Sequence, residues 1–380
     1  MHNMGWQDQG GTRGKAALTM GELESGAAAA VPRGAYPKRI DAIVLAGTHQ
    51  NLRRLIAGKN KAFLEIGGRP LVRHVVDALL EAREIDEIFV VGPVEQLGNA
   101  LQGVPSRVRT VQQEGKMLTN TWAAIYASES RHASEPADEV HRRPMLIISC
   151  DLPLISGAAI DDFVARCAAE DLGAPRPYAM IVGVADEEGV TVFYPERGKP
   201  GIIRPYVELS FGRLRLANIY VARPRWLAHQ EFLQTGFTLR KAKDWRNVLK
   251  LVFNVLSQPG GWGAAWLTLR MQLTLMLSKG KGAWYRRLRA GNTREWVEKS
   301  VSDVLGGAVR VVTTPYGGLS LDVDDDEDYR ILKERYDDWI EWHQRMGNGA
   351  DNRSQQDQRE RRPERDQHHR DQQEDEKRQG

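Results

Sequence analysis

Cysteines and long apolar runs are both scarce in this 380-residue chain. Its two cysteines, Cys150 and Cys167, are too few for a disulfide framework or a zinc site. The first residues lack the continuous apolar segment of a secretory signal. The apolar stretch at 251–278 is interrupted at Pro259, which leaves two pieces too short to span a bilayer. These absences predict a reduced, cytoplasmic setting and no transmembrane helix.

Both ends of the chain lack the residues that build a core. Residues 1–38 are rich in Gly and Ala and show neither strand alternation nor a sustained apolar face. Residues 347–380 contain no Val, Ile, Leu or aromatic residue. Such segments cannot bury enough apolar surface to offset the entropy lost on ordering. We therefore expect a disordered leader and a disordered charged tail.

Two common nucleotide-binding motifs are also missing. Gly47 follows the first apolar run, but no further glycine of a G-x-G-x-x-G fingerprint follows it. Gly58 and Lys59 precede Asn60, which is not the Ser or Thr of a P-loop. The chain therefore has neither a dinucleotide fingerprint nor a P-loop.

An anion site is nevertheless predicted near Gly47. At the carboxyl end of a first strand, glycine lets backbone N–H groups approach a phosphate closely. Arg53, Arg54 and Lys61 follow within the same stretch and supply counter-charges.

The pattern of apolar residues between the tails predicts alternating strands and helices. Strands are expected at Ile40–Leu45, Ile85–Val91, Arg107–Val111, Met145–Cys150, Tyr178–Val184, Val190–Tyr194, Ala217–Val221 and Val309–Val312. Helices are expected at Pro70–Arg83, Thr121–Ser128, Ile160–Ala169 and Glu327–Arg345. This rhythm predicts an α/β fold, Rossmann-like, with a mostly parallel sheet covered by helices on both faces.

Residues 226–306 break this rhythm and are expected to form a helical insertion. The core would then comprise residues 39–225, completed by a strand and helix in 307–346. Six tryptophans lie in the insertion and are expected to bury apolar area against the sheet domain. They are Trp226, Trp245, Trp262, Trp266, Trp284 and Trp296.

Basic residues dominate between 223 and 299, although the net charge of the chain is only +3. Phosphorylated substrates or an anionic membrane surface would suit this distribution. The stretch at 251–278 either packs on the α/β domain or makes a peripheral membrane contact. No nucleic-acid partner is expected.

Asp151 is the strongest candidate for chemistry after the opening stretch. It directly follows a buried strand, so it should lie at the same sheet edge as Gly47. Mg²⁺ typically takes one or two carboxylates together with phosphate oxygens and waters. Asp151 is therefore a candidate metal ligand, with capping of the next helix or turn as the alternative.

The stretch from Asp41 to Leu71 resembles the N-terminal signature of the MobA-like nucleotidyltransferases. Residues 61–71 read KAFLEIGGRPL and match the K-A-x-L-x-x-G-G-x-P-L half of that signature. Residues 45–47 supply its LAG, but Thr48 and His49 replace the glycine or serine that usually follows. The resemblance implies the GT-A-like variant of the fold.

The resemblance also implies roles for individual residues. Lys61, Asp151 and Arg54 would be catalytic. Leu45, Ala46, Gly47, Arg53, Lys61 and Asn120 would bind the nucleotide. Asp151, Asn218 and Asp324, or Asp322 in place of Asp324, would hold Mg²⁺. Apart from the resemblance, the guanidinium fork of Arg204 could bind an acceptor phosphate.

Five of these residues have a structural alternative. Lys61 could be a solvated surface side chain, and Asn218 a buried structural amide. Asn120 and Asp324 could cap helices. Arg204 could pair with an acid such as Glu208.

The implied reaction moves a nucleoside monophosphate from an NTP to a phosphorylated sugar, polyol or cofactor precursor and releases pyrophosphate. A GT-A glycosyltransferase using a nucleotide-sugar is the first alternative, although Asp151-Leu152-Pro153 is not its usual D-x-D. A non-catalytic protein that binds a nucleotide or a partner is the second.

Overall fold

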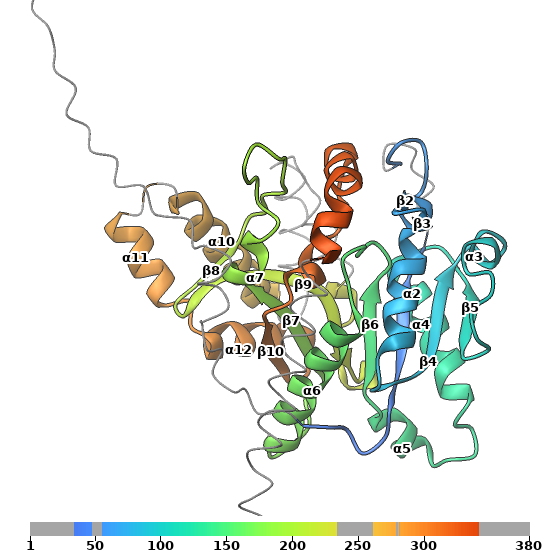
Figure 1. Cartoon of the computed structure of the whole chain (residues 1–380). Helices are drawn as coiled ribbons and strands as arrows, with labels where there is room; N and C mark the ends of the chain where they lie inside the picture. The colour runs from blue at the N-terminus through green and yellow to red at the C-terminus, as the bar shows by residue number, and fades with distance from the viewer. Residues whose placement is uncertain (1–33, 48–54, 234–260, 279, 281, 342–380) are drawn as a thin grey trace, which may run out of the picture.

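The computed structural model describes residues 34–47, 55–233, 261–278, 280 and 282–341. Its centre is an eight-stranded sheet in the order β10-β7-β9-β6-β1-β4-β5, with β8 paired to β9 (Figure 1). The strands are β1 (Ile40–Leu45), β4 (Ile85–Gly92), β5 (Val108–Gln112), β6 (Met145–Ser149), β7 (Met180–Asp186), β8 (Val207–Leu209), β9 (Gly212–Ala222) and β10 (Val309–Thr314). A separate hairpin joins β2 (Glu65–Ile66) to β3 (Arg69–Pro70).

Most neighbouring strands run parallel. β1 pairs in parallel with β4 and β6, β4 with β5, and β7 with β10. β9 is antiparallel to β6, β7 and β8. Parallel strands end at the same edge of a sheet, so the residues that follow β1, β4 and β6 meet there.

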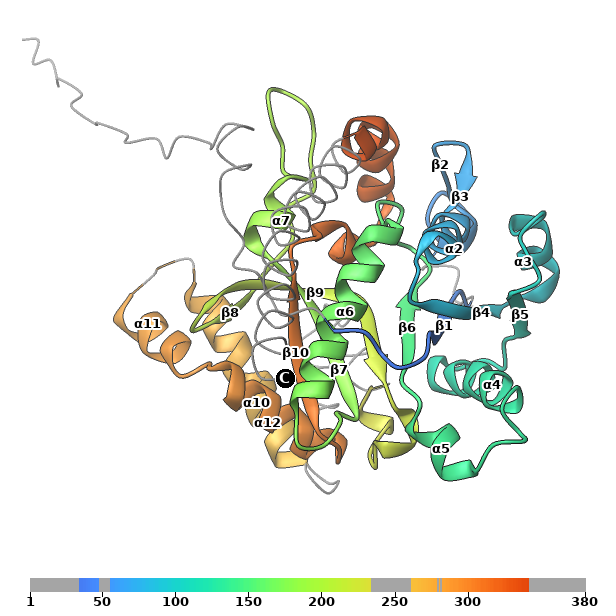
Figure 2. The same ribbon diagram turned by 60° about the horizontal axis from the view of Figure 1, so that its bottom comes forward.

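Helices cover both faces of the sheet. The helices of the α/β part are α2 (Leu71–Glu81), α3 (Val94–Ala100), α4 (Met117–Ser130), α5 (Ala137–Arg142), α6 (Gly157–Gly173) and α7 (Glu187–Thr191). A further helix spans 326–341, and short 3-10 turns span η2 (Lys61–Phe63), η3 (Pro224–Trp226) and η4 (Gly317–Ser320). Figure 2 shows α2 and α4 on opposite sides of β1 and β4. The predicted α/β fold is therefore confirmed, as a mostly parallel mixed sheet.

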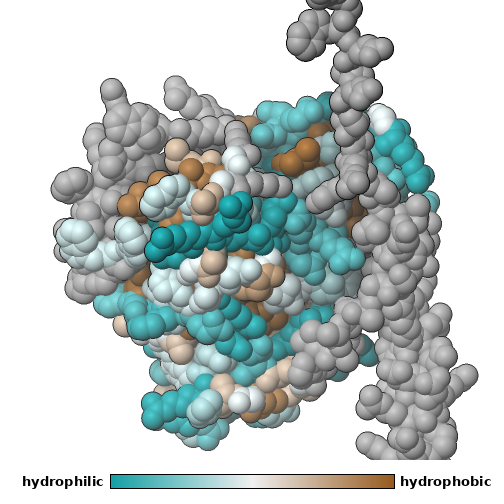
Figure 3. Space-filling model, turned by 90° about the vertical axis from the view of Figure 1, so that its left-hand side faces the viewer, coloured by the Kyte–Doolittle hydropathy of each residue, from teal (hydrophilic) through white to brown (hydrophobic). Residues whose placement is uncertain are grey.

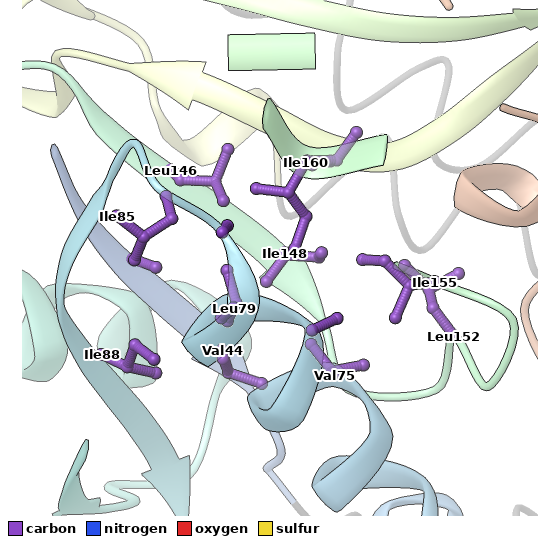
Figure 4. Packing of buried hydrophobic residues seen from close by; sticks show 14 of the residues in the cluster. Val44, Val75, Leu79, Ile85, Ile88, Leu146, Ile148, Leu152, Ile155 and Ile160 are labelled. Atoms are coloured by element: carbon purple, nitrogen blue, oxygen red, sulfur yellow. The ribbon is translucent and has the colours of Figure 1, made fainter. Parts of the chain in front are cut away.

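The central strand β1 is buried on both faces, which explains its continuous apolar run. Successive side chains of a strand point to opposite faces. Ala42 and Val44 pack in a cluster with α2 and α6. Ile43 belongs to the cluster on the α4 side. Figure 4 shows the first cluster, in which Val44 lies near Val75 and Leu79 of α2.

The strand expected at Val190–Tyr194 is wrong. The chain instead forms α7 up to Thr191, followed by a turn and bend over 192–194. The side chain of Asp186 caps this helix by accepting the N–H of Gly189 at 2.7 Å. Two glutamates in the first turn favour the helix further, because negative charge is stabilised at a helix N-terminus. A short apolar run cannot distinguish strand from helix by its periodicity.

Three helices of the expected insertion are described: α10 (Gly261–Leu277), α11 (Ala283–Ala290) and α12 (Arg294–Leu305). α12 packs along the edge strand β10, while α10 and α11 contact β8. Tyr285 of α11 is buried and donates its hydroxyl to Glu208 of β8 at 2.9 Å. The insertion is therefore anchored to the sheet through β8 and β10. Its predicted boundaries, and those of the two tails, remain predictions.

The expected burial of the tryptophans is wrong for three of them. Trp262, Trp266 and Trp284 are 76%, 57% and 73% exposed. Trp226 and Trp296 are partly buried, and Trp245 lies outside the described residues. Within the described ranges, no helix combines the length and apolarity needed to cross a bilayer.

Candidate active site

Two acidic segments meet at the carboxyl edge of the sheet. Asp151 lies two residues after the end of β6 and is only 6% exposed. The N–H of Val323 donates to the backbone oxygen of Asp151 at 3.3 Å, so the stretch 322–328 lies alongside it. Val323 is fully buried with Leu321 in a second apolar cluster, which anchors this stretch. Residues far apart in the sequence are thereby brought to one place.

Lys61 forms ion pairs with both segments. Its Nζ lies 3.3 Å from Asp151 Oδ2 and 3.4 Å from Asp324 Oδ1. Asn60 fixes the turn that carries the lysine, because its side chain accepts the N–H of Ala62. Only 20% of the Lys61 side chain is exposed, so the solvated alternative is wrong.

The pKa of Lys61 is raised above its ordinary value. Burial by itself would lower it, but the nearby carboxylates of Asp151, Asp324 and Asp322 outweigh that effect. A raised lysine pKa keeps the ammonium charged at neutral pH and beyond the usual range. Lys61 is therefore a permanent cation between two carboxylates.

Ser149 and Asn218 lie beside Asp151. The hydroxyl of Ser149 donates to Asp151 Oδ1, which orients the carboxylate. Ile148 pairs with Ile219 across β6 and β9, so Asn218 is the next residue of β9 toward the same edge. The role of Ser149 had no signal in the sequence beyond its position two residues before Asp151. The expected metal-ligand role of Asn218 stays a prediction.

Arg204 also contacts the acidic stretch 322–328. Its Nη2 donates to the backbone oxygen of Asp322 at 2.7 Å and to the carboxylate of Asp328. Asp328 Oδ2 also accepts the backbone N–H of Asp324 at 2.9 Å. Arg204 thus pairs with Asp328, and more distantly with Asp324 Oδ2 at 3.9 Å, rather than with Glu208. Its expected contact with the acceptor stays a prediction.

Replacing Arg204 tests whether its role is positional. The Arg204 and Asp328 side chains are 11% and 8% exposed, and removing one partner of a buried pair costs about 3–5 kcal/mol. We expect Arg204→Met to lower the unfolding free energy by about 3 kcal/mol in urea titrations. The double variant Arg204→Met/Asp328→Asn should lose less unfolding free energy than the sum of the losses in the two single variants. An unchanged stability together with a raised KM for the acceptor would show instead that Arg204 binds the acceptor.

Asp325, and not Asp324, caps the helix at 326–341. Asp325 Oδ1 accepts the N–H of Asp328 at 3.0 Å, which leaves the Asp324 carboxylate to face Lys61. Asp326 Oδ1 accepts the N–H of Ala57 at 2.8 Å and ties this helix to the opening stretch. The two arginines predicted there, Arg53 and Arg54, lie outside the described residues.

The predicted nucleotide residues Gly47 and Asn120 are in contact. A Cβ added to Gly47 would lie 2.8 Å from Asn120 Nδ2. α4 begins at Met117 and not at Thr121 as expected, so Asn120 lies in its first turn. Asn120 Oδ1 accepts the N–H groups of Glu114 and Gly115 at 2.7 and 3.0 Å and holds the turn before α4.

Leu45 and Ala46 lead directly into this corner. Leu45 is the last residue of β1, and Ala46 is fully buried, with its N–H donated to the oxygen of Val91 at 2.9 Å. The predicted nucleotide contacts Leu45, Ala46, Gly47 and Asn120 therefore lie together at the end of β1.

Gly47→Ala should disturb this corner. The new methyl group would displace the Asn120 amide, and crowding of this kind typically costs 1–3 kcal/mol. We expect the KM for the nucleotide to rise by about tenfold. Gly98→Ala is the matched control, since a Cβ there meets nothing within 4 Å. Equal KM values in the two variants would show that Gly47 is not part of the nucleotide site.

The donor set fits a small hard cation. The Lys61 ammonium occupies a point within 3.3–3.4 Å of oxygens of both Asp151 and Asp324. Two carboxylates completed by phosphate oxygens and waters are typical of Mg²⁺ sites. No group of three or more ligating side chains of the His, Cys, Asp or Glu type occurs among the described residues. Substrate oxygens would therefore have to complete the coordination.

Comparison with known proteins identifies a family domain in this chain. Residues 42–209 match the profile of the MobA-like NTP transferase domain. The 3-deoxy-manno-octulosonate cytidylyltransferase of Geobacter sulfurreducens is 27% identical over 108 residues, which are 28% of this chain and 39% of that protein. The match thus spans about two fifths of the length of that curated relative.

One solved structure supports the fold alone. A hypothetical transferase from Thermus thermophilus superposes with a TM-score of 0.51 at 22% identity, over 77% of this chain and 99% of its own. The match to the 4-diphosphocytidyl-2C-methyl-D-erythritol synthase of Anaerococcus prevotii covers 79% of this chain and 96% of that protein, with a TM-score of 0.38 at 14% identity. Residues 42–209 therefore form a MobA-like NTP transferase domain.

Proposed function

We propose that the protein is a Mg²⁺-dependent nucleotidyltransferase that moves a nucleoside monophosphate from an NTP to a phosphorylated acceptor and releases pyrophosphate. The observation that carries this proposal is the position of Lys61, which bridges Asp151 and Asp324 at the carboxyl edge of the sheet. The neighbouring strand β1, which leads to Gly47, ends at the same edge. That edge is where open α/β sheets bind phosphates. A family domain over residues 42–209 supports the same reaction class.

In the proposed reaction, an acceptor phosphate oxygen attacks the α-phosphorus in line and pyrophosphate leaves. Lys61 neutralises the charge that grows on the non-bridging and leaving oxygens. Asp151 and Asp324 would hold Mg²⁺, which when bound stabilises the same charge as a Lewis acid. Ser149 fixes the orientation of Asp151. Arg204 fixes the backbone of Asp322 directly, and that of Asp324 through the carboxylate of Asp328. Catalysis would then rest on positioning and electrostatics, without a covalent intermediate.

The corner formed by Gly47 and Asn120 is the proposed nucleotide site. The absence of a side chain at Gly47 lets the Asn120 amide approach the end of the strand closely, and Asn120 holds the adjacent turn. Because the curated relative is named as a cytidylyltransferase, CTP is the first nucleotide to test. A cytoplasmic location belongs to the same proposal.

A thermal-shift panel of the four NTPs with and without Mg²⁺ tests the proposal, followed by an acceptor screen with the preferred nucleotide. We expect one NTP to raise the melting temperature in a metal-dependent way and to yield pyrophosphate with a phosphorylated acceptor. Release of a nucleoside diphosphate from a nucleotide-sugar would identify a glycosyltransferase instead. Nucleotide binding without turnover over the acceptor panel would favour the non-catalytic alternative.

A further inference from the structure

A stripe of large apolar side chains is exposed along α10. Trp262, Trp266, Leu269, Leu273 and Met276 follow one another at alternating four- and three-residue spacing, which places them on one face of the helix. Their exposed fractions range from 39% for Leu273 to 76% for Trp262. Exposed apolar patches of this kind mark interaction surfaces on proteins.

The other side of α10 is occupied by its own neighbours. Thr274 is buried and accepts the side-chain amide of Asn292 at 3.2 Å. Arg270 donates to Asn292 Oδ1 at 2.7 Å and lies over the ring of Trp296, 4.6 Å from its centroid. The helix is thereby fixed to α11 and α12 in an orientation that turns the apolar stripe outward.

The surface next to this stripe is basic. Trp284 of α11 is 73% exposed, and Arg286 and Arg287 on the same helix are exposed as well. No aspartate or glutamate occurs in the sequence between Asp244 and Glu295. Figure 3 shows this side of the molecule, on which brown and pale residues are exposed beside teal ones.

We propose that α10 and α11 form a docking surface for an anionic phospholipid bilayer. Tryptophan side chains are favoured at membrane interfaces because one part of the ring system is apolar and the indole N–H is polar. Helices that lie in the interface combine such a face with arginines and lysines that attract anionic headgroups. A second copy of the chain is a poorer occupant, because it would bring its own basic residues against this surface. The inference is independent of the reaction proposed above.

Co-sedimentation of the full-length protein with vesicles tests the proposal. One set contains phosphatidylcholine alone, and the other contains equal parts of phosphatidylcholine and phosphatidylglycerol. We expect binding to the anionic vesicles only, weakening as salt is added. Trp262→Ser/Trp266→Ser should lower the partition coefficient by about tenfold or more, since both rings would otherwise be buried in lipid. Arg286→Gln/Arg287→Gln should lower it by about fivefold per charge.

Matched controls separate this face from general surface effects. Leu172→Ser on α6 removes a 60% exposed leucine elsewhere, and Lys299→Gln removes a 75% exposed charge from α12. Both should bind vesicles like the wild type. Circular dichroism should show that all variants fold, because every replaced side chain is exposed.

Three outcomes would overturn the proposal. Equal binding by the wild type and the double tryptophan variant would place the lipid contact elsewhere. A wild-type dimer or captured acidic partner that Trp262→Ser/Trp266→Ser releases, without vesicle binding, would make the face a protein interface. A monomer that binds neither kind of vesicle would show that another part of the chain covers the stripe.

Discussion

Asp151→Asn is expected to lose metal-dependent turnover by about a thousandfold while the protein stays folded. The amide keeps the shape of the side chain and a carbonyl oxygen that can accept the Ser149 hydroxyl. It loses the negative charge that pairs with Lys61 and that would hold Mg²⁺. Initial rates of pyrophosphate release at saturating Mg²⁺ measure the effect.

Two controls define the Asp151→Asn result. Asp138→Asn makes the same charge change on α5, away from the carboxyl edge, and should keep wild-type rates. The melting temperature of Asp151→Asn should change by only a few degrees, since a loss of about 1 kcal/mol shifts it by roughly 2–4 °C in a domain of this size. Turnover near that of the wild type would rule out Asp151 as the metal-binding carboxylate.

Lys61→Ala is expected to lower kcat/KM by about 100- to 1,000-fold. The variant removes the cation that faces the triphosphate in the proposed reaction. Lys61→Arg should recover only part of the rate, because a planar guanidinium cannot occupy the position of a compact ammonium between two carboxylates. Lys59→Ala is the matched control, since Lys59 is 60% exposed and pairs only distantly with Glu65.

The same variant has a second readout that does not depend on activity. Without Lys61, the carboxylates of Asp151 and Asp324 face each other with less compensating charge. We expect Mg²⁺ alone to raise the melting temperature of Lys61→Ala more than that of the wild type, because the ion would replace the missing cation. An unchanged kcat/KM, or a Mg²⁺ effect equal to that of the wild type, would contradict the placement of Lys61 at the reaction centre.

The position of the site at the sheet edge was predictable from the sequence. Gly47 and Asp151 directly follow apolar runs, and parallel strands must end at the same edge. Asn120 was also predicted near the nucleotide, although the start of its helix was misplaced. These predictions depend on local periodicity and on the topology of parallel sheets, and both can be read from a sequence.

The contacts between distant charged residues were not predictable. Arg204 and Asp328 are 124 positions apart, and any of several acids could have been the partner of the arginine. The ion pair of Lys61 with Asp324 likewise depends on how the acidic stretch returns beside β6. Such pairings are set by tertiary packing, which the periodicity of apolar residues does not predict. One sequence signal for these pairings was not used. Arg215 is a charged residue within the apolar strand β9, and its Nη2 lies 3.5 Å from Asp322 Oδ1.

The insertion illustrates the same limit of prediction from the sequence. Its helical character follows from the sequence, but the expectation that its tryptophans are buried assumed that apolar side chains always find cover within the chain. Trp262 and Trp284 are exposed instead. Composition indicates how much apolar area a segment carries, whereas the partner of that area depends on the assembled fold.

A single-turnover assay of pyrophosphate release most directly tests the central claim that Lys61, Asp151 and Asp324 form a nucleotidyl-transfer centre. The account predicts one pyrophosphate per nucleotidylated acceptor, formed only when NTP, Mg²⁺ and the phosphorylated acceptor are all present. Asp151→Asn should release no pyrophosphate on the same timescale under the same conditions. Pyrophosphate formed at an equal rate by Asp151→Asn, or a nucleoside diphosphate as the product, would contradict the account.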